Sequence, residues 1–311
     1  MTAVLWELIV FGVKEARACL FAGIFLILLL ISRHLPLFGL PRYDFLCLAA
    51  ILVQILLVWT GLETKDELLV LCAFHAVGLT LECFKTHPAV GSWSYPEKAW
   101  LKLGTVPLYS GFMYAAVASY MCQAWRLLQL KLERYPSYYL SVPLACAIYL
   151  NFFTNHYLPD LRWWLVAAVF LVFGPTRVRF TVLTTRRSMP LVLSFALIGF
   201  FIWVAENYAT YFGAWAYPRQ SSGWQFVSFH ILSSWFLLVI VSFILVADLK
   251  HLRVKLKVGR FGVVECVQVP VQNSASYDAF TITGPANRSA MTVSASNCPT
   301  WYRASDSTAS G

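Results

Sequence analysis

The chain has 311 residues, of which 59% are hydrophobic and only 13% are charged, and its formal net charge is +9. Soluble domains carry about 25% charged residues, so the composition excludes an ordinary water-soluble fold. In a membrane protein Lys and Arg act first as topology signals, and no nucleic-acid partner is predicted. Because each spanning backbone must satisfy its own hydrogen bonds, we predict an all-α, polytopic helical bundle with the lipid bilayer as partner.

In chain order, apolar runs predict about eight transmembrane helices, on the scale of about 20 mostly apolar residues per span. The predicted spans are residues 16–33, 43–60, 68–84, 106–124, 138–154, 162–176, 190–208 and 227–247. No small-residue cleavage site follows the first run, which indicates an uncleaved span. The sixth run is short and precedes Pro175, so a tilted or re-entrant element is the alternative there.

The basic residues predict the topology of these spans. Up to residue 260, 15 Lys and Arg residues lie on the side of the two termini and 7 lie on the other side. By the positive-inside rule, both termini are expected in the cytoplasm.

Composition divides the chain into two regions. Residues 1–255 are predicted to form the transmembrane domain, with an internal repeat of residues 16–124 and 138–247. Residues 256–311 are first basic and then rich in Ser, Thr and Ala. Such a composition buries little apolar surface, so this tail is predicted to be disordered.

The repeat is marked by a phrase that occurs twice, GSWSYP at residues 91–96 and GAWAYP at 213–218. Each copy follows an apolar run that ends in a glutamate, Glu82 before the first and Glu206 before the second. An even number of spans per half keeps two repeats parallel. We therefore predict two parallel four-helix halves, with both phrases on the non-cytoplasmic side.

Ionisable groups in spans predict the chemical site, because each costs about 2.5–3.5 kcal/mol at the bilayer centre. Glu82 and Glu206 are the predicted catalytic residues, together with His75, which lies seven residues before Glu82 on the same helical stripe. Gly78, on that stripe, is expected to let a backbone or a ligand come close. The alternative for Glu82 is a structural pair with Lys85, one turn later.

The expected substrate-binding residues surround these acids. They are Trp93, Tyr95, Trp215 and Tyr217 of the two phrases, His156 and Asp160 of the turn between the fifth and sixth spans, and His230 at the start of the eighth. The alternative for the aromatic residues is an interface belt, and the alternative for His156 and Asp160 is a hydrogen-bonded loop. The His and acidic residues lack the spacing of metal motifs, so no metal and no cofactor are predicted.

Longer stretches are similar to a known family. The segments CAFHAVGLTLECFKT, GSWSYPE, NFFTNHYLPDLRW and SSWFLLVIVSFILVADLKHLR resemble the YoaT-like family of bacterial integral membrane proteins, a domain of unknown function (DUF817). The resemblance covers about residues 5–255 and implies a multi-pass protein of the bacterial inner (plasma) membrane. It implies no activity.

A looser similarity concerns short words only. The repeated glutamate and Gly-x-aromatic-x-Tyr words, with Gly104 to Pro107, look like those of membrane-embedded carotenoid hydratases and cyclases. This similarity implies protonation of a polyene by a carboxylic acid that an apolar site keeps neutral, beside aromatic rings that stabilise a cation.

Two functions stay open at this point. One is a cofactor-independent membrane enzyme that performs acid/base chemistry on an isoprenoid or other lipid. The alternative is a proton-coupled transporter or permease of a small molecule, in which the same glutamates exchange protons. The sequence does not decide whether the protein is an enzyme.

Overall fold

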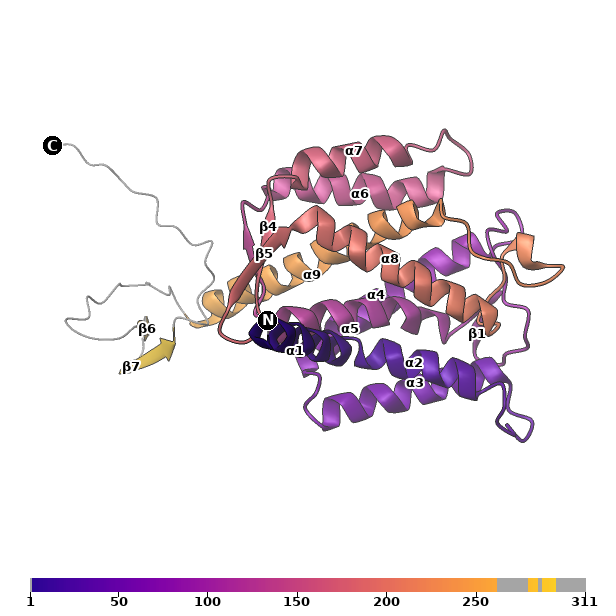
Figure 1. Cartoon of the computed structure of the whole chain (residues 1–311), viewed down its shortest axis with the longest axis horizontal. Helices are drawn as coiled ribbons and strands as arrows, with labels where there is room; N and C mark the ends of the chain where they lie inside the picture. The colour runs from indigo at the N-terminus through magenta and orange to yellow at the C-terminus, as the bar shows by residue number, and fades with distance from the viewer. Residues whose placement is uncertain (1, 262–278, 285–286, 295–311) are drawn as a thin grey trace. The chain divides into compact units, whose positions relative to one another are not determined.

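The structure, a computed structural model, describes residues 2–261, 279–284 and 287–294 (Figure 1). This described part is mostly helical, as predicted, but it also contains short strands that an all-α class does not include. Its α-helices are α1 (Thr2–Ala18), α2 (Leu20–Ile31), α3 (Arg42–Trp59), α4 (Lys65–Lys85), α5 (Ser110–Leu127), α6 (Tyr138–Thr154), α7 (Arg162–Phe173), α8 (Leu191–Tyr211) and α9 (Ile231–Phe261).

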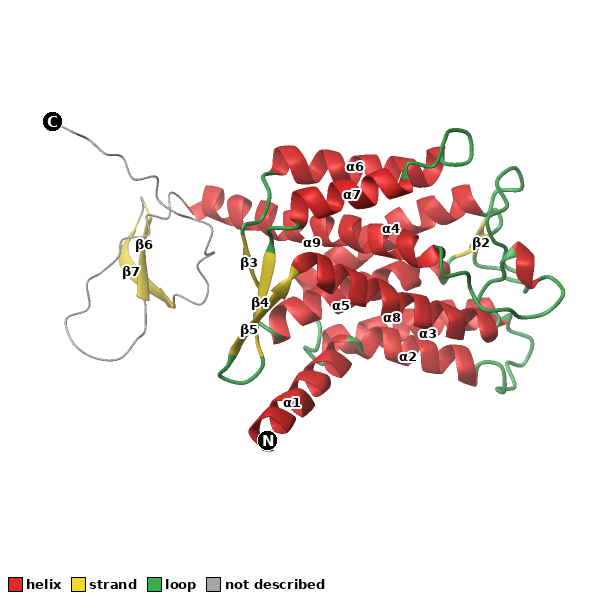
Figure 2. Cartoon of the chain, turned by 45° about the horizontal axis from the view of Figure 1, so that its top comes forward, coloured by secondary structure: helices red, strands yellow, loops and turns green. Residues whose placement is uncertain are grey.

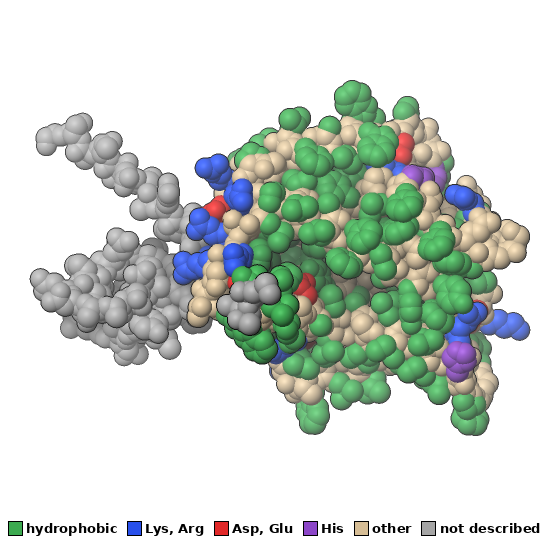
Figure 3. All heavy atoms as spheres, viewed as in Figure 1, with side chains coloured by type: hydrophobic (Ala, Val, Ile, Leu, Met, Phe, Trp, Pro, Cys, Tyr) green, Lys and Arg blue, Asp and Glu red, His purple; other side chains and the backbone are tan. Residues whose placement is uncertain are grey.

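Three of these helices, α3, α4 and α8, are long and apolar enough to cross a membrane. Shorter apolar helices are α2, α6, α7 and the part Ile231–Ala247 of α9. Figure 3 shows hydrophobic side chains spread over the viewed face of the helices. These observations indicate a membrane protein, as predicted.

The first predicted span, 16–33, begins in the wrong place. The chain forms two helices there, because α1 ends at Ala18 and α2 begins at Leu20. Charged side chains occupy the last turns of α1, including Lys14 and Arg17, whereas α2 has none. A single uniform span across this junction would place those charges in hydrocarbon, which is costly.

The fourth predicted span also differs at its start. Residues expected to be helical from 106 form strand β2 (Val106–Pro107), which pairs with β1 (Lys102–Leu103). Gly104 makes the turn between them at a φ of +58°, a backbone conformation that glycine adopts at little cost. The helix α5 therefore begins only at Ser110.

A three-stranded antiparallel sheet lies at one end of the helices of residues 1–246. Its strands β3 (Lys131–Glu133), β4 (Arg177–Thr181) and β5 (Arg186–Pro190) pair in the order β3–β4–β5. Figures 1 and 2 show the sheet at one end of the helices and the β1–β2 hairpin at the other. Along β4 the exposed Arg177 and Arg179 flank the buried Val178, as the two-residue period of a strand requires.

The chain divides into two compact units, residues 1–246 and 247–311. In the second unit, strands β6 (Ala279–Gly284) and β7 (Asn287–Ser294) form an antiparallel hairpin. The rest of the tail predicted to be disordered, from residue 262 onward, lies outside the described residues, and its disorder stays a prediction.

Candidate functional site

The two copies of the repeated phrase pair with each other. Ser94 N donates to Ala216 O and Ala216 N donates to Ser94 O, each at 2.9 Å. The Trp93 and Tyr217 rings, one from each copy, meet edge to face with centroids 6.2 Å apart. The phrase therefore occurs twice because its copies form one antiparallel bridge between segments 122 residues apart.

Glu82 lies near the end of α4 and is only 2% exposed. Its Oε2 accepts hydrogen bonds from Trp93 Nε1 and from Tyr95 Oη, each at 2.7 Å, and its Oε1 accepts one from Tyr114 Oη at 2.8 Å. Loss of solvent, followed by the neighbouring Glu82 carboxylate, raises the pKa of the Tyr95 phenol well above its usual range. Tyr95 thus stays protonated and donates to the carboxylate.

Tyr114 reaches Glu82 by crossing Gly78. A Cβ atom at Gly78 would stand 2.5 Å from the Tyr114 ring, so only a glycine leaves room for that ring. The close approach predicted at Gly78 therefore exists, and the approaching group is a side chain of α5. Sequence reasoning missed Tyr114, although it is an aromatic residue in the span that follows the first phrase.

His75 lies on the same helix but contacts other groups. Its ring packs edge to face on Phe112, with centroids 4.6 Å apart, and stands against Gly111. Its Nδ1 is buried and has no hydrogen-bond partner. The structure places no hydrogen bond between His75 and Glu82.

Glu206 lies in the last two turns of α8 and is 3% exposed. Its Oε1 accepts a hydrogen bond from Tyr217 Oη, and its Oε2 accepts one from Trp235 Nε1 at 2.5 Å. Burial and the Glu206 carboxylate raise the pKa of the Tyr217 phenol well above its usual range. Each predicted acid is thus held by a phenol and an indole, and the indole of Trp235 was missed.

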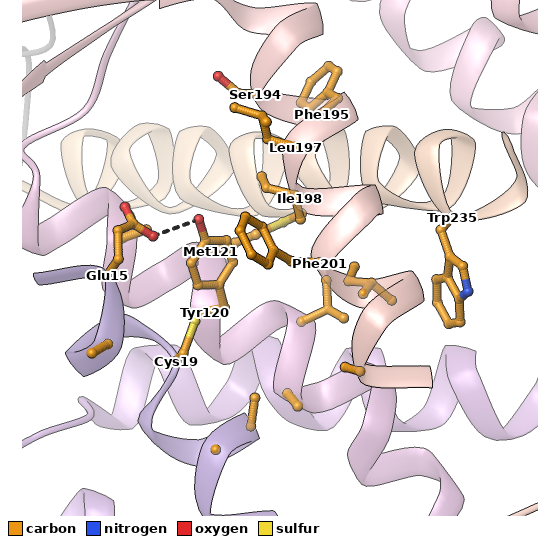
Figure 4. A pocket seen from close by; sticks show the side chains of 18 of the residues that line it. Glu15, Cys19, Tyr120, Met121, Ser194, Phe195, Leu197, Ile198, Phe201 and Trp235 are labelled. Atoms are coloured by element: carbon orange, nitrogen blue, oxygen red, sulfur yellow. Dashed lines mark hydrogen bonds between the residues drawn. The ribbon is translucent and has the colours of Figure 1, made fainter. Parts of the chain in front are cut away.

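A cavity of about 690 Å³ reaches Glu206. It lies between α1, α2, α5, α8 and α9, and both Trp215 and Trp235, the indole donor to Glu206, line it. Most other lining residues are apolar, such as Met121, Ile198 and Phe201 in Figure 4. Glu82 does not line this cavity, so the two acids differ in their access to a ligand.

A second acid lines the same cavity away from Glu206. The Oε2 atom of Glu15 in α1 accepts a hydrogen bond of 3.0 Å from Tyr120 Oη of α5. Burial raises the pKa of the Glu15 carboxyl, and the hydrogen bond from Tyr120 opposes that shift. Sequence reasoning missed both residues, because Glu15 lies just before the first predicted span and Tyr120 has the pattern of a core residue.

Residues at the start of α3 hold the loop that carries the second phrase. Arg42 Nη2 donates to Phe212 O at 2.7 Å, its Nη1 pairs with Glu97 at 2.6 Å, and Tyr43 Oη donates to Gly213 O at 3.1 Å. These positioning residues were not singled out from the sequence. The two charged residues at the start of an apolar run, Arg42 and Asp44, could have indicated them.

Asp44 holds the segment after the first phrase. Its carboxylate is 1% exposed and accepts backbone hydrogen bonds from Trp100 N at 2.7 Å and Leu101 N at 2.9 Å. The loops that follow α4 and α8 are therefore both anchored to the first turn of α3.

The remaining predicted binding residues form a separate polar cluster around Lys85. Lys85 Nζ lies 2.8 Å from His156 Nε2, so the alternative in which Lys85 pairs with Glu82 is wrong. Loss of solvent and the Lys85 ammonium lower the pKa of His156. Asp160 forms an ion pair with Arg162 at 3.2 Å. Burial raises the pKa of the Asp160 carboxyl, but the hydrogen bonds from Asn151 and from Arg162 N, together with the Arg162 charge, outweigh burial and lower that pKa.

His230 is exposed, and its contact with this polar cluster is made by its backbone oxygen, which accepts a hydrogen bond from Arg162 Nη1 at 3.3 Å. The structure thus connects His156, Asp160 and His230 with Lys85 and Arg162, and no hydrogen bond joins them to either glutamate. Among the described residues, no group of three His, Cys, Asp or Glu side chains is arranged to hold a metal ion.

Comparison with known proteins gives a family without an assigned activity. The sequence profile described as "Protein of unknown function (DUF817)" matches residues 7–243. Over 247 residues the chain is 54% identical to the uncharacterized protein YoaT of Bacillus subtilis (strain 168). The aligned region covers 79% of this chain and 93% of YoaT. No solved structure matches the chain.

Proposed function

The chain belongs to the DUF817 family of proteins of unknown function, and we propose that it is a cofactor-independent membrane enzyme that performs acid/base chemistry on an isoprenoid or similar lipid. In this proposal Glu206 is the catalytic acid. The observation that carries it is the apolar cavity of about 690 Å³ that is lined by a buried carboxyl group and by two indoles, of which Trp235 donates to that carboxyl group.

The reaction begins with a neutral Glu206, the form that an apolar site favours. Its proton passes to one carbon of a C=C bond, whose π electrons form the new C–H bond and leave a cation on the adjacent carbon. Trp215 and Trp235 line the same cavity, and indole rings stabilise such a cation through their faces. Loss of a proton from a neighbouring carbon to the Glu206 carboxylate restores the acid, so the net reaction is an isomerisation or cyclisation that consumes no co-reactant.

Tyr217 and Trp235 have a second role in this scheme. Both donate hydrogen bonds to Glu206, and hydrogen bonds to the charged form stabilise a carboxylate. They therefore stabilise the anion that exists between the two proton transfers. Donors fixed before the reaction stabilise developing charge without reorganising.

Glu82 has a structural role in the proposal. Its carboxyl group accepts hydrogen bonds from Trp93, Tyr95 and Tyr114, and it does not line the cavity that contains Glu206. Through Trp93 and the Ser94–Ala216 bridge it holds the first phrase against the second. This arrangement supports two halves related by the repeat, with α4 and α5 matching α8 and α9.

We further propose that eight helices, α2 to α9, cross the bacterial plasma membrane in two parallel halves, with both termini in the cytoplasm. The excess of basic residues on the side of the termini supports this topology. Reporter fusions after residues 65, 97, 132, 182, 220 and 255 test it. A cytoplasmic signal at residue 97 or 220 overturns it.

The test of the function is a comparison of membrane lipid extracts from a deletion strain, its parent and a strain that expresses Glu206→Gln. We expect the deletion and Glu206→Gln strains to accumulate the same apolar precursor and to lack the same isomeric product, at normal abundance of the variant protein. If the lipids are unchanged but uptake or export of a small molecule depends on Glu206, the enzyme is excluded and the transporter is supported.

A further inference from the structure

The polar group in the cavity distant from Glu206 gives information about the ligand. In Figure 4, Glu15 with Tyr120 lies on one side of the cavity and Trp235 on the other, with Ile198 and Phe201 between them. Residues from Leu191 to Glu206 of α8 line the cavity, and a helical stretch of that length spans about 22 Å. The cavity therefore extends along α8, with the Glu15 carboxyl group on one side and the Trp235 partner of Glu206 on the other.

Glu15 has a free hydrogen-bonding oxygen in this cavity. Tyr120 donates to Oε2, whereas none of the hydrogen bonds of the described residues ends at Oε1. The carboxylate accepts, and the Tyr120 oxygen has remaining acceptor capacity. Glu15 is half-buried, and the mostly apolar side chains around it offer these polar atoms few other partners.

The charge around this end decides which ligand group fits. Lys14 Nζ already donates to Thr181 O at 3.1 Å, and Arg187 pairs with Glu7 at 2.7 Å. A phosphate in contact with the Glu15 carboxylate would meet a group of the same charge. A hydroxyl group, in contrast, donates to a carboxylate oxygen without like-charge repulsion.

We propose that Glu15 and Tyr120 form an end-group site that binds the hydroxyl group of a lipid alcohol, whose hydrocarbon chain extends along α8 toward Glu206. This inference rests on the proposed function, because it names the substrate class of the same cavity. It makes the cavity selective for an uncharged alcohol over the corresponding diphosphate.

The test measures binding to the full-length protein in nanodiscs, by the change in tryptophan fluorescence. The probes are geranylgeraniol, its methyl ether, which keeps the size but loses the hydroxyl donor, and geranylgeranyl diphosphate. For the wild type we expect the alcohol to bind roughly tenfold more tightly than the ether, as one charge-assisted hydrogen bond allows. The diphosphate should bind more weakly than the alcohol.

Variants assign this preference to the site. Glu15→Leu should weaken the alcohol roughly tenfold and leave the ether unchanged, whereas Glu15→Gln, which keeps an acceptor oxygen, should retain most of the preference. Glu7→Gln is the matched control on the same helix, and it should bind as the wild type does. Equal affinities for alcohol and ether, or a preference for the alcohol that survives Glu15→Leu, overturn the proposal.

Glu206→Gln separates this inference from the proposed function. The variant should bind geranylgeraniol as the wild type does, because the end-group site is intact. If Glu206→Gln keeps full lipid-converting activity, the proposed function fails while the alcohol preference stands. If Glu206→Gln is inactive but Glu15→Leu binds the alcohol and the ether with the same affinities as the wild type does, the end-group site fails and the proposed function stands.

Discussion

Glu82 and Glu206 each precede a copy of the Gly-x-Trp-x-Tyr-Pro phrase, yet their surroundings differ. Both are buried, and both accept hydrogen bonds from an indole and a phenol. Glu82 has a third donor, Tyr114, and does not line the cavity of about 690 Å³, whereas Glu206 has two donors and lines it. Two similar sequence phrases thus accompany carboxyl groups that differ in their donors and in their access to this cavity.

The residues one turn before the two acids also differ. The glycine one turn before Glu82, Gly78, makes room for the Tyr114 ring. The residue one turn before Glu206 is Ile202, which lines the cavity. A tyrosine side chain therefore packs against the turn before Glu82, whereas the corresponding turn before Glu206 faces the cavity.

The largest expected effect distinguishes the two acids directly. Glu206→Gln should lower activity by about 100-fold or more, because loss of a general acid removes about 10²–10⁴ of rate. Glu82→Gln should lower activity less than tenfold and act mainly on stability. Rates of lipid conversion in membranes, normalised to protein abundance, measure both effects. Equal losses of activity in the two variants would show that the sites are functionally alike.

The second prediction closes the space at Gly78. Gly78→Ala should destabilise the protein by about 1–3 kcal/mol, since the added methyl overlaps the Tyr114 ring and overpacking has that cost. Thermal unfolding of the purified protein in detergent is the measurement. Gly23→Ala in α2 is the control, because nothing lies within 4 Å of its added Cβ. The prediction is wrong if Gly78→Ala is as stable as Gly23→Ala.

The third prediction removes only the extra donor of the closed site. Tyr114→Phe should destabilise the protein by about 1–2 kcal/mol, because Glu82 Oε1 loses its hydrogen bond in a buried place. Activity should be retained, since the Glu206 side is untouched. Tyr149→Phe is the control, because its hydroxyl makes an exposed contact of 3.4 Å. Loss of activity with unchanged stability would assign a catalytic role to the Glu82 side.

The smallest expected effect concerns pH and the polar cluster around Lys85. The pKa of His156 is lower in the folded protein than its usual value near 6.5, so the unfolded chain binds more protons as the pH falls through 6.5. The contribution of His156 to stability should therefore decrease from pH 7.5 to 5.5, whereas the raised pKa of Glu15 acts in the opposite direction. In His156→Gln the unfolding temperature at pH 5.5, relative to that at pH 7.5, should be higher than in the wild type. An unchanged difference would place the titrating group elsewhere.

The sequence by itself determined the membrane class, most of the helices and the two glutamates with their aromatic partners. Composition reports directly on the solvent, and a long apolar run is helical in a bilayer because its backbone has no other hydrogen-bond partner. Family membership was equally readable, since it depends on residue order alone. Trp93, Tyr95 and Tyr217 were singled out because they belong to a repeated phrase. Each of these side chains donates a hydrogen bond to one of the two glutamates.

Tertiary structure decided what residue order does not encode locally. Tyr114, Trp235 and the pair of Glu15 with Tyr120 reach their partners from other helices, and such contacts depend on how helices pack rather than on spacing along one of them. The same packing sent Lys85 to His156 instead of Glu82. It also placed the large cavity beside Glu206 and Glu15 but not beside Glu82, because cavities form where side chains from several helices leave space between them.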